Sequence, residues 1–347
     1  MTDQRLPVIE GPYVGDILAQ PRALADTLAW LSAPGRWAAT QAFVQARPWR
    51  RIVLTGMGSS LHGLHPLRLA LIGAGQTPLM FETAELLHYA LSLCDEDTLV
   101  IAVSQSGASA ETVRLLDANR RSPVIGVTNT EGSPLAQRAD HLLQMRAGPE
   151  STVSCKTYVS ALLVLHWLGA VFRGEDERDT LAALGPAPAL CEAYLRDWRL
   201  RVQELVPLVR GVRHLFLAGR GPSLASACTG ALILKESTRL HAEGMSSAAF
   251  RHGPMEMIGE GMRLLVFEGL PVTRALNLGL VNELGDGLAG SIGEGAVQAA
   301  LRMPSVPAAL LPVLEILPVQ MLSLAIAALK GQEAGHFQRA TKVTDCE

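Results

Sequence analysis

The sequence has few charged residues, and its charges nearly cancel. Charged residues make up 18% of the 347 positions, and 30 Lys and Arg against 33 Asp and Glu leave a net charge of −3. A nucleic-acid-binding protein needs a basic face that neutralises phosphates, which this balance does not offer. Hydrophobic residues reach 48%, which excludes a disordered chain. The low charge also indicates that a second subunit covers part of the apolar surface.

Cysteine is scarce, and no two cysteines form a CxxC pair. Five cysteines in a long chain, an odd number, argue for reduced thiols and a reducing compartment. The first residues lack the basic-then-apolar run of a secretory signal. Histidines are dispersed without a His/Asp pair at ligand spacing, so we predict no metal and no cofactor. Together these absences predict a cytoplasmic protein.

Long uninterrupted apolar runs are also missing. The most apolar stretch, residues 306–329, is interrupted by Pro307, Pro312, Glu315, Pro318 and Gln320. A helix that spans a bilayer needs about 20 nearly uninterrupted apolar residues. We therefore predict a buried helix in this stretch and no membrane partner.

The sequence does contain an internal repeat. Gly56-Met-Gly58 and Gly219-Arg-Gly221 each follow an apolar run, and they lie 163 residues apart. A second pair of apolar runs, 98–103 and 263–267, lines up at the same spacing. Runs such as 123–128 are apolar throughout, which is typical of strands covered on both faces. Because helical patterns alternate with these strands, we predict an α/β fold with two doubly wound parallel-sheet sandwiches in tandem.

Charge and proline content predict the domain boundaries. The densest charge run is 173–179, and Gly185-Pro-Ala-Pro188 follows it. An amphipathic pattern near the N-terminus is expected to pack on the first sandwich. The predicted segments are an N-terminal helical segment over 1–34, a first domain over 35–180, a linker helix over 181–200, a second domain over 201–330 and a C-terminal tail over 331–347.

Two serine-rich loops are predicted where a ligand would bind, beyond the carboxyl ends of parallel strands. One is Gly56–Ser60, and the other is Ser104–Ser109, directly after the predicted strand 99–103. Glycine lets the backbone approach a ligand, a helix N-terminus offers unpaired N–H groups, and hydroxyls complete the shell. These loops predict a phosphate site formed without Lys or Arg. Its serines are Ser59, Ser60, Ser104, Ser106 and Ser109.

Other interpretations of these loops are weaker. Serines often cap helices without binding a ligand, but two serine loops at neighbouring strand ends favour a site. A Rossmann dinucleotide site lacks its third small residue because Leu61 stands there, and no P-loop motif is present. The second half carries Phe267-Glu-Gly269 at the serine-loop position, so we predict one phosphate site only.

Six short motifs follow one another through both halves. They are Gly58-Ser-Ser60, Ser104-Gln-Ser-Gly107, Leu234-Lys-Glu236, His241-Ala-Glu243, Arg251-His-Gly-Pro254 and Lys342-Val-Thr344. In this order they resemble the sugar isomerase (SIS) domain family, in particular the isomerase half of glucosamine-6-phosphate synthase and its stand-alone relatives. The resemblance runs from about residue 35 to the C-terminus.

The resemblance implies a role for each matched position. Glu236 matches the base that moves a proton between C1 and C2 of the sugar. His252 matches a ring-opening histidine that a neighbouring subunit supplies. Lys342 matches a lysine of the C-terminal tail that contacts the open-chain sugar and can form a Schiff base. The resemblance therefore implies a homodimer with shared active sites, a sugar phosphate as the small-molecule partner, and a tail that closes the site. The positions that match the phosphate loops are Ser60, Ser104, Gln105, Ser106 and Ser109.

These residue types suit the chemistry, because a proton must leave a carbon beside a carbonyl, and a carboxylate base with a nearby cation can assist that step. We predict a phosphosugar isomerase that interconverts aldose and ketose or also releases an amine from C2, the second being slightly favoured. Thr229, Ala249 and Ala108 stand where the family carries acidic residues, which argues against glucosamine-type specificity. No glutaminase domain is expected. Two alternatives stay open: a non-catalytic phosphosugar sensor and a deglycase for sugar-phosphate adducts of amino acids.

Overall fold

The computed structural model describes residues 6–285, 287–339 and 341–344, which divide into two compact units. The unit that we call the N-lobe contains residues 20–150, 154–188 and 341–344. The C-lobe contains residues 6–19, 151–153 and 189–339, apart from residue 286. Each lobe is built on one parallel sheet, which confirms the predicted fold class.

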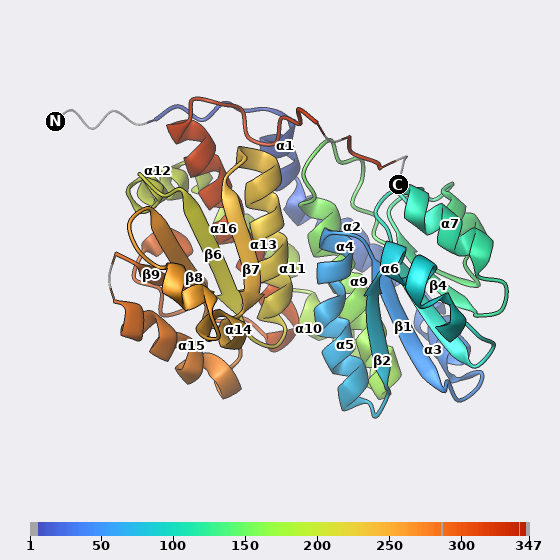
Figure 1. The fold of residues 1–347 in the computed structure, drawn as a ribbon. Helices are drawn as coiled ribbons and strands as arrows, with labels where there is room; N and C mark the ends of the chain where they lie inside the picture. Colours follow the sequence, from blue (N-terminus) through green and yellow to red (C-terminus); the bar gives the residue numbers. More distant parts are fainter. Residues whose placement is uncertain (1–5, 286, 340, 345–347) are drawn as a thin grey trace. The chain divides into compact units, whose positions relative to one another are not determined.

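The N-lobe sheet has five parallel strands in the order β2-β1-β3-β4-β5 (Figure 1). They are β1 (Arg51–Gly56), β2 (Pro78–Glu82), β3 (Thr98–Val103), β4 (Val124–Thr128) and β5 (His141–Gln144). Every residue of β3 is buried, as its unbroken apolar run predicts for a central strand covered on both faces. The strand order reverses beside β1, the position at which doubly wound sheets bind ligands.

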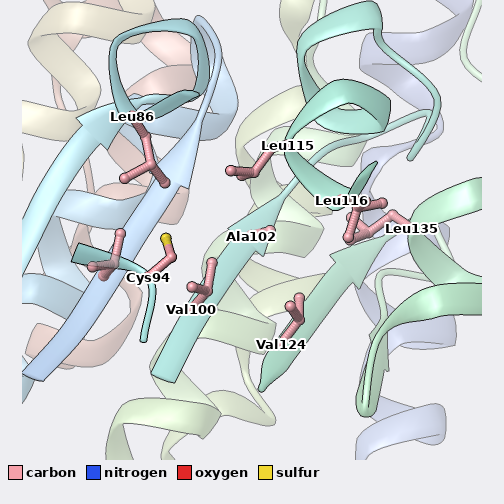
Figure 2. Packing of buried hydrophobic residues seen from close by; sticks show 9 residues of the cluster. Leu86, Cys94, Val100, Ala102, Leu115, Leu116, Val124 and Leu135 are labelled. Atoms are coloured by element: carbon pink, nitrogen blue, oxygen red, sulfur yellow. The ribbon is translucent and has the colours of Figure 1, made fainter. Parts of the chain in front are cut away.

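Helices form a layer on each face of this sheet. In one layer α9 (Lys156–Arg173) packs against α2 (Gln20–Leu31), α3 (Arg36–Gln45) and α5 (Leu64–Gly73). In the other, α7 (Ala110–Ala118) packs against α6 (Thr83–Tyr89) and α8 (Pro134–Arg138). Figure 2 shows the core of this second layer, where Leu86 of α6 and Leu115 of α7 face Val100 and Ala102 of β3. Two short helices, α4 (Ser59–His62) and α10 (Glu177–Leu184), complete the N-lobe.

The C-lobe sheet repeats this arrangement with four parallel strands in the order β7-β6-β8-β9 (Figure 1). The strands are β6 (His214–Gly219), β7 (His241–Ser246), β8 (Met262–Phe267) and β9 (Ala289–Ile292). The pairing of Leu54 with Ile101 in the N-lobe corresponds to that of Leu217 with Leu265 here. The predicted spacing of 163 residues is therefore right for β6 and wrong by one residue for β8, because the second half has one residue more between the paired positions.

Helices also cover both faces of the C-lobe sheet. On one side α13 (Ser223–Thr238) packs against β6, β7 and α16 (Leu311–Leu329), and α12 (Trp198–Val209) also packs against α16. The opposite side carries α14 (Ser247–Arg251) and α15 (Pro271–Leu284), and α11 (Ala187–Leu195) crosses the boundary between the units. The small residues of α13 allow close packing, since a Cβ on Gly230 would lie 3.1 Å from Val319 of α16.

The stretch Ala308–Leu329 is long and apolar enough to cross a membrane by length and composition, but 89% of its apolar 18-residue window is buried inside the protein. The prediction of a buried helix at 306–329 is therefore confirmed, with Pro312 in its first turn and Pro318 inside it.

The N-terminal segment is divided between the lobes. Helix α2 packs on α9 of the N-lobe, as predicted. Helix α1 (Pro12–Leu18) instead belongs to the C-lobe, where the buried Tyr13 hydroxyl lies 3.3 Å from the Ser323 hydroxyl of α16. The expectation that the whole segment packs on the first sandwich is wrong for α1, because the burial site of its aromatic side chain lies on α16.

Candidate functional site

The turn after β1 brings Ser59 and Ser60 to the first turn of α4. A Cβ on Gly56 would lie 2.9 Å from the carbonyl oxygen of Val103, so glycine is required where the turn passes the end of β3. Gly58 has a φ of +52°, a conformation that glycine adopts at little cost. Both serines are half-buried at the carboxyl end of β1.

The loop after β3 carries the remaining predicted phosphate ligands. The Ser104 hydroxyl accepts a hydrogen bond from the Gly107 N–H at 3.1 Å, and the Ser106 hydroxyl accepts one from the Ala108 N–H at 3.2 Å. The Gln105 carbonyl accepts from the Asn129 N–H at 3.1 Å, which fixes the loop to the end of β4. Ser109 precedes α7. These contacts order the backbone before any ligand arrives.

Both loops lie at the same edge of the N-lobe sheet. β1 and β3 are hydrogen-bonded neighbours that pair Gly56 with Val103, so the residues that follow them start about one strand spacing apart, roughly 4.8 Å. The structure therefore brings the Gly56–Ser60 turn and the Ser104–Ser109 loop together. Backbone N–H groups, glycine and hydroxyls at strand ends are suited to hold an anion.

Lys342 also belongs to the N-lobe. Its Nζ lies 2.6 Å from Glu150 Oε2, and the Glu150 side chain is fully buried. Two residues later, the Thr344 carbonyl accepts a hydrogen bond from the Ala110 N–H at 3.1 Å, at the start of α7 next to the serine loop. Sequence reasoning missed this ion pair because its partners are 192 residues apart and no spacing relates them.

Glu236 and His252 lie in the other unit. Glu236 is half-buried near the C-terminal end of α13, beside the exposed Lys235. His252 is exposed after α14, and its N–H donates to the Ala249 carbonyl at 3.0 Å. The predicted site residues thus divide into one group on the N-lobe, which contains the serine loops and Lys342, and one on the C-lobe.

The C-lobe carries a buried carboxyl group at the position equivalent to the first serine turn. Ser223, 163 residues after Ser60, donates to Glu315 Oε1 at 2.7 Å, and Ser226 donates to Oε2 at 3.0 Å. Burial raises the pKa of Glu315 to about 8, although the two serine hydrogen bonds lower it, and the charge of Glu268 raises it further. Sequence reasoning missed this role, because Glu315 stands out only as an interruption of an apolar run.

Glu268 follows β8, where the N-lobe has Ser104. It is buried, and its carboxylate accepts hydrogen bonds from the Ser291 hydroxyl at 3.1 Å and from the Gly295 N–H at 3.0 Å. Arg274 lies 3.9 Å from the same carboxylate. The loss of hydroxyls predicted for this loop has therefore been accompanied by a buried acid that is held inside the lobe.

In the described ranges, no group of three or more His, Cys, Asp or Glu side chains is arranged to hold a metal ion. Burial raises the pKa of the Cys228 thiol to about 11 and that of Cys191 to about 12. These thiols stay protonated at neutral pH, so neither is suited to act as a nucleophile.

The fold and these loops define a class of protein, and the chain belongs to the SIS domain family. The family profile matches residues 46–170 and 208–285, one segment in each half. A glutamine–fructose-6-phosphate aminotransferase (isomerizing) from Pyrococcus horikoshii is 30% identical over 310 residues, which cover 86% of this chain and 52% of the relative. The chain thus spans about half the length of the curated relatives that it matches.

Two solved structures share the fold. One is the C-terminal domain of a glucosamine-fructose-6-phosphate aminotransferase from Francisella tularensis, with a TM-score of 0.83 and 20% identity over 96% of this chain and 99% of that one. The other is a glucosamine-6-phosphate deaminase from Thermotoga maritima, with a TM-score of 0.75 and 18% identity over 97% and 100% of the two chains. At these identities the likeness establishes the fold.

Proposed function

We propose that this chain is a phosphosugar isomerase that moves a proton between neighbouring carbons of a sugar phosphate, with or without loss of an amine. The observation that carries the proposal is the pair of loops at one edge of the N-lobe sheet, where Ser60 and Ser106 follow hydrogen-bonded strands. Such a site holds a phosphate as a remote handle, and its binding energy fixes the reacting carbons of the sugar.

The other matched residues supply the acid–base chemistry in this proposal. Glu236 removes the proton from the carbon beside the carbonyl and returns it to the neighbouring carbon. Lys342 stabilises the negative charge that develops on the oxygen in between. His252 opens the sugar ring from a second copy of the chain in a cytoplasmic homodimer, and its exposed position suits an approach to another subunit.

Amine loss is the favoured form of the reaction. The Glu236, His252 and Lys342 set matches the amino-sugar enzymes of the family, and the shared fold with a glucosamine-6-phosphate deaminase supports the same choice. A hexosamine phosphate and one water molecule would then give a ketose phosphate and ammonia, the water supplying the C2 carbonyl oxygen.

Glu236→Gln tests the proposal, with Lys235→Gln as the matched control because Lys235 is the exposed neighbour on the same helix. A panel of hexose and hexosamine phosphates is assayed for ketose and ammonia, and binding is followed by thermal shift. We expect Glu236→Gln to lose about 10³-fold or more in kcat with binding retained, and the control to keep wild-type turnover.

A wild-type protein that binds sugar phosphates without converting any of them would overturn the enzyme proposal in favour of a sensor. Release of a free amino acid from a sugar-phosphate adduct would instead identify a deglycase. Light scattering at micromolar concentration tests the dimer, and a monomer would contradict the role of His252 across subunits.

A further inference from the structure

The Glu150 carboxylate is buried and surrounded by donors. Its Oε1 accepts hydrogen bonds from the N–H groups of Cys155 and Thr157, both at 3.0 Å, where α9 begins. Its Oε2 accepts from the Thr157 hydroxyl at 2.6 Å and from the Ser154 hydroxyl at 3.5 Å. A helix N-terminus favours a negative charge, so this is a prepared place for an anionic side chain.

The remaining donor comes from the C-terminal tail. Lys342 Nζ lies 2.6 Å from Glu150 Oε2, and the lysine side chain is 22% exposed while the carboxylate is completely buried. Removing one partner of a pair this buried leaves an uncompensated charge, which costs more stability than breaking a surface ion pair does. The tail has a second attachment at the start of α7, through Thr344 and Ala110.

These two attachments define the path of the tail. It runs from the segment before α9 to the first residue of α7, directly after Ser109 of the serine loop. All of these residues belong to the N-lobe. The ion pair with Glu150 therefore fixes the ammonium group of Lys342 on the lobe that carries the loops proposed to hold the phosphate.

We propose, on the basis of the proposed function, that Glu150 is a positioning residue that holds the ammonium group of Lys342 on the N-lobe, where it stabilises the negative charge that develops on the sugar oxygen. An ammonium group has three N–H donors, so the contact with Glu150 does not prevent donation to a sugar oxygen.

A double-mutant cycle of Glu150→Gln and Lys342→Met tests the pairing. Glutamine keeps the size of the side chain and an acceptor for the N–H groups of α9, but it replaces the charge that faces Lys342. We expect kcat to fall about 10- to 100-fold in Glu150→Gln with KM changed less than about threefold, and the double variant to be no slower than Lys342→Met. Additive losses would overturn the pairing.

Thr157→Val is the matched structural control, because it removes a 2.6 Å hydrogen bond to the same carboxylate but leaves the ion pair. We expect it to lower the melting temperature as much as Glu150→Gln does and to keep kcat within about twofold. If its kcat falls as far as that of Glu150→Gln, the carboxylate acts only through the stability of the segment, and the proposal fails.

Borohydride trapping tests the cationic role. Borohydride reduces an imine between lysine and a ketose phosphate to a stable amine, which mass spectrometry detects on Lys342. We expect no adduct on the wild-type protein during turnover. An adduct on Lys342 would show a nucleophile and overturn this part of the proposal.

Limited proteolysis with trypsin separates this proposal from the proposed function, because it needs no turnover. A lysine held by a buried carboxylate is a poor trypsin site, so Glu150→Gln should be cleaved after Lys342 several-fold faster than wild type, while cleavage after the exposed Arg339 stays unchanged. Equal cleavage after Lys342 would overturn the pairing, whereas absent turnover with faster cleavage would overturn only the proposed function.

Discussion

The two lobes share a strand order but end their equivalent strands with opposite chemistry. In the N-lobe, the turn after β1 and the loop after β3 leave Ser60 and Ser106 half-buried. In the C-lobe, the equivalent Ser223 is fully buried and donates to Glu315, and the buried Glu268 follows β8. The C-lobe has thus placed its own carboxyl groups where the N-lobe leaves hydroxyls partly open. The loops at the ends of the duplicated strands can therefore bind an external anion only where no carboxyl group of the same lobe already accepts their hydrogen bonds.

The largest effect is expected from Gly107→Ala in the N-lobe. A Cβ there would lie 2.7 Å from Ser133 Cβ and 2.9 Å from Thr128 Oγ1, at a φ of +62°. Ser133 cannot move aside easily because its hydroxyl caps α8 through the Ala136 N–H. We expect phosphate affinity, measured by titration calorimetry, to fall more than about 100-fold.

Gly269→Ala is the matched control in the C-lobe. Its φ is +70°, but the nearest atoms to a Cβ would be 3.4 Å away, so only the backbone conformation is unfavourable, at about 1 kcal/mol. Affinity should stay within about twofold. Equal losses of affinity in the two variants would contradict the assignment of the phosphate to the N-lobe.

The next effect concerns stability of the C-lobe. Because the pKa of Glu315 is raised to about 8, the folded lobe keeps a proton that the unfolded chain releases near pH 4.5. Stability is therefore fully present below pH 4.5 and is lost as the pH rises toward 8, by about 3 kcal/mol at pH 7. Glu315→Gln should flatten this dependence, measured as the melting temperature between pH 5 and pH 8.

The charge of Glu268 acts on Glu315, and Arg274 lies 3.9 Å from the Glu268 carboxylate. The exposed Glu192, replaced by Gln, serves as the control and should keep the wild-type profile. A Glu315→Gln variant whose melting temperature still falls with pH as steeply as wild type would show that this carboxyl group does not control the stability of the lobe.

The smallest effect comes from exchanging one hydroxyl in each lobe. Ser106→Ala should weaken phosphosugar binding about 10- to 100-fold, because a hydrogen bond to a charged group contributes about 1.5–3 kcal/mol. Ser223→Ala should leave binding unchanged and lower the melting temperature, because it removes a donor from the buried Glu315. If Ser223→Ala weakens phosphosugar binding as much as Ser106→Ala does, the assignment of phosphate binding to the N-lobe hydroxyls alone is wrong.

Much of the fold could be predicted from local patterns. The apolar runs at 98–103 and 123–128 became the buried strands β3 and β4, and the two Gly-x-Gly turns marked the repeat. The single-residue shift at β8 could not be read, because an apolar run shows where a strand lies but not its hydrogen-bonded register. The lobe on which α1 packs could not be predicted either, since an amphipathic pattern shows that a helix buries one face but not which surface it packs against.

Only part of the candidate site could be predicted from the sequence, for the same reason. The serine loops could be found because consecutive residues carry them and parallel strands align their ends. The Lys342–Glu150 pair and the Glu315–Ser223 contact join residues 192 and 92 positions apart, and nothing local relates their partners.

The sequence by itself therefore determined the class of fold, the duplication and the edge of the sheet where hydroxyls gather, because periodicity and turn chemistry act over a few residues. Only the tertiary structure decided which charges meet. A carboxylate becomes the partner of a lysine or the buried acid of a helix through packing of distant segments, and burial then sets the energy of that contact.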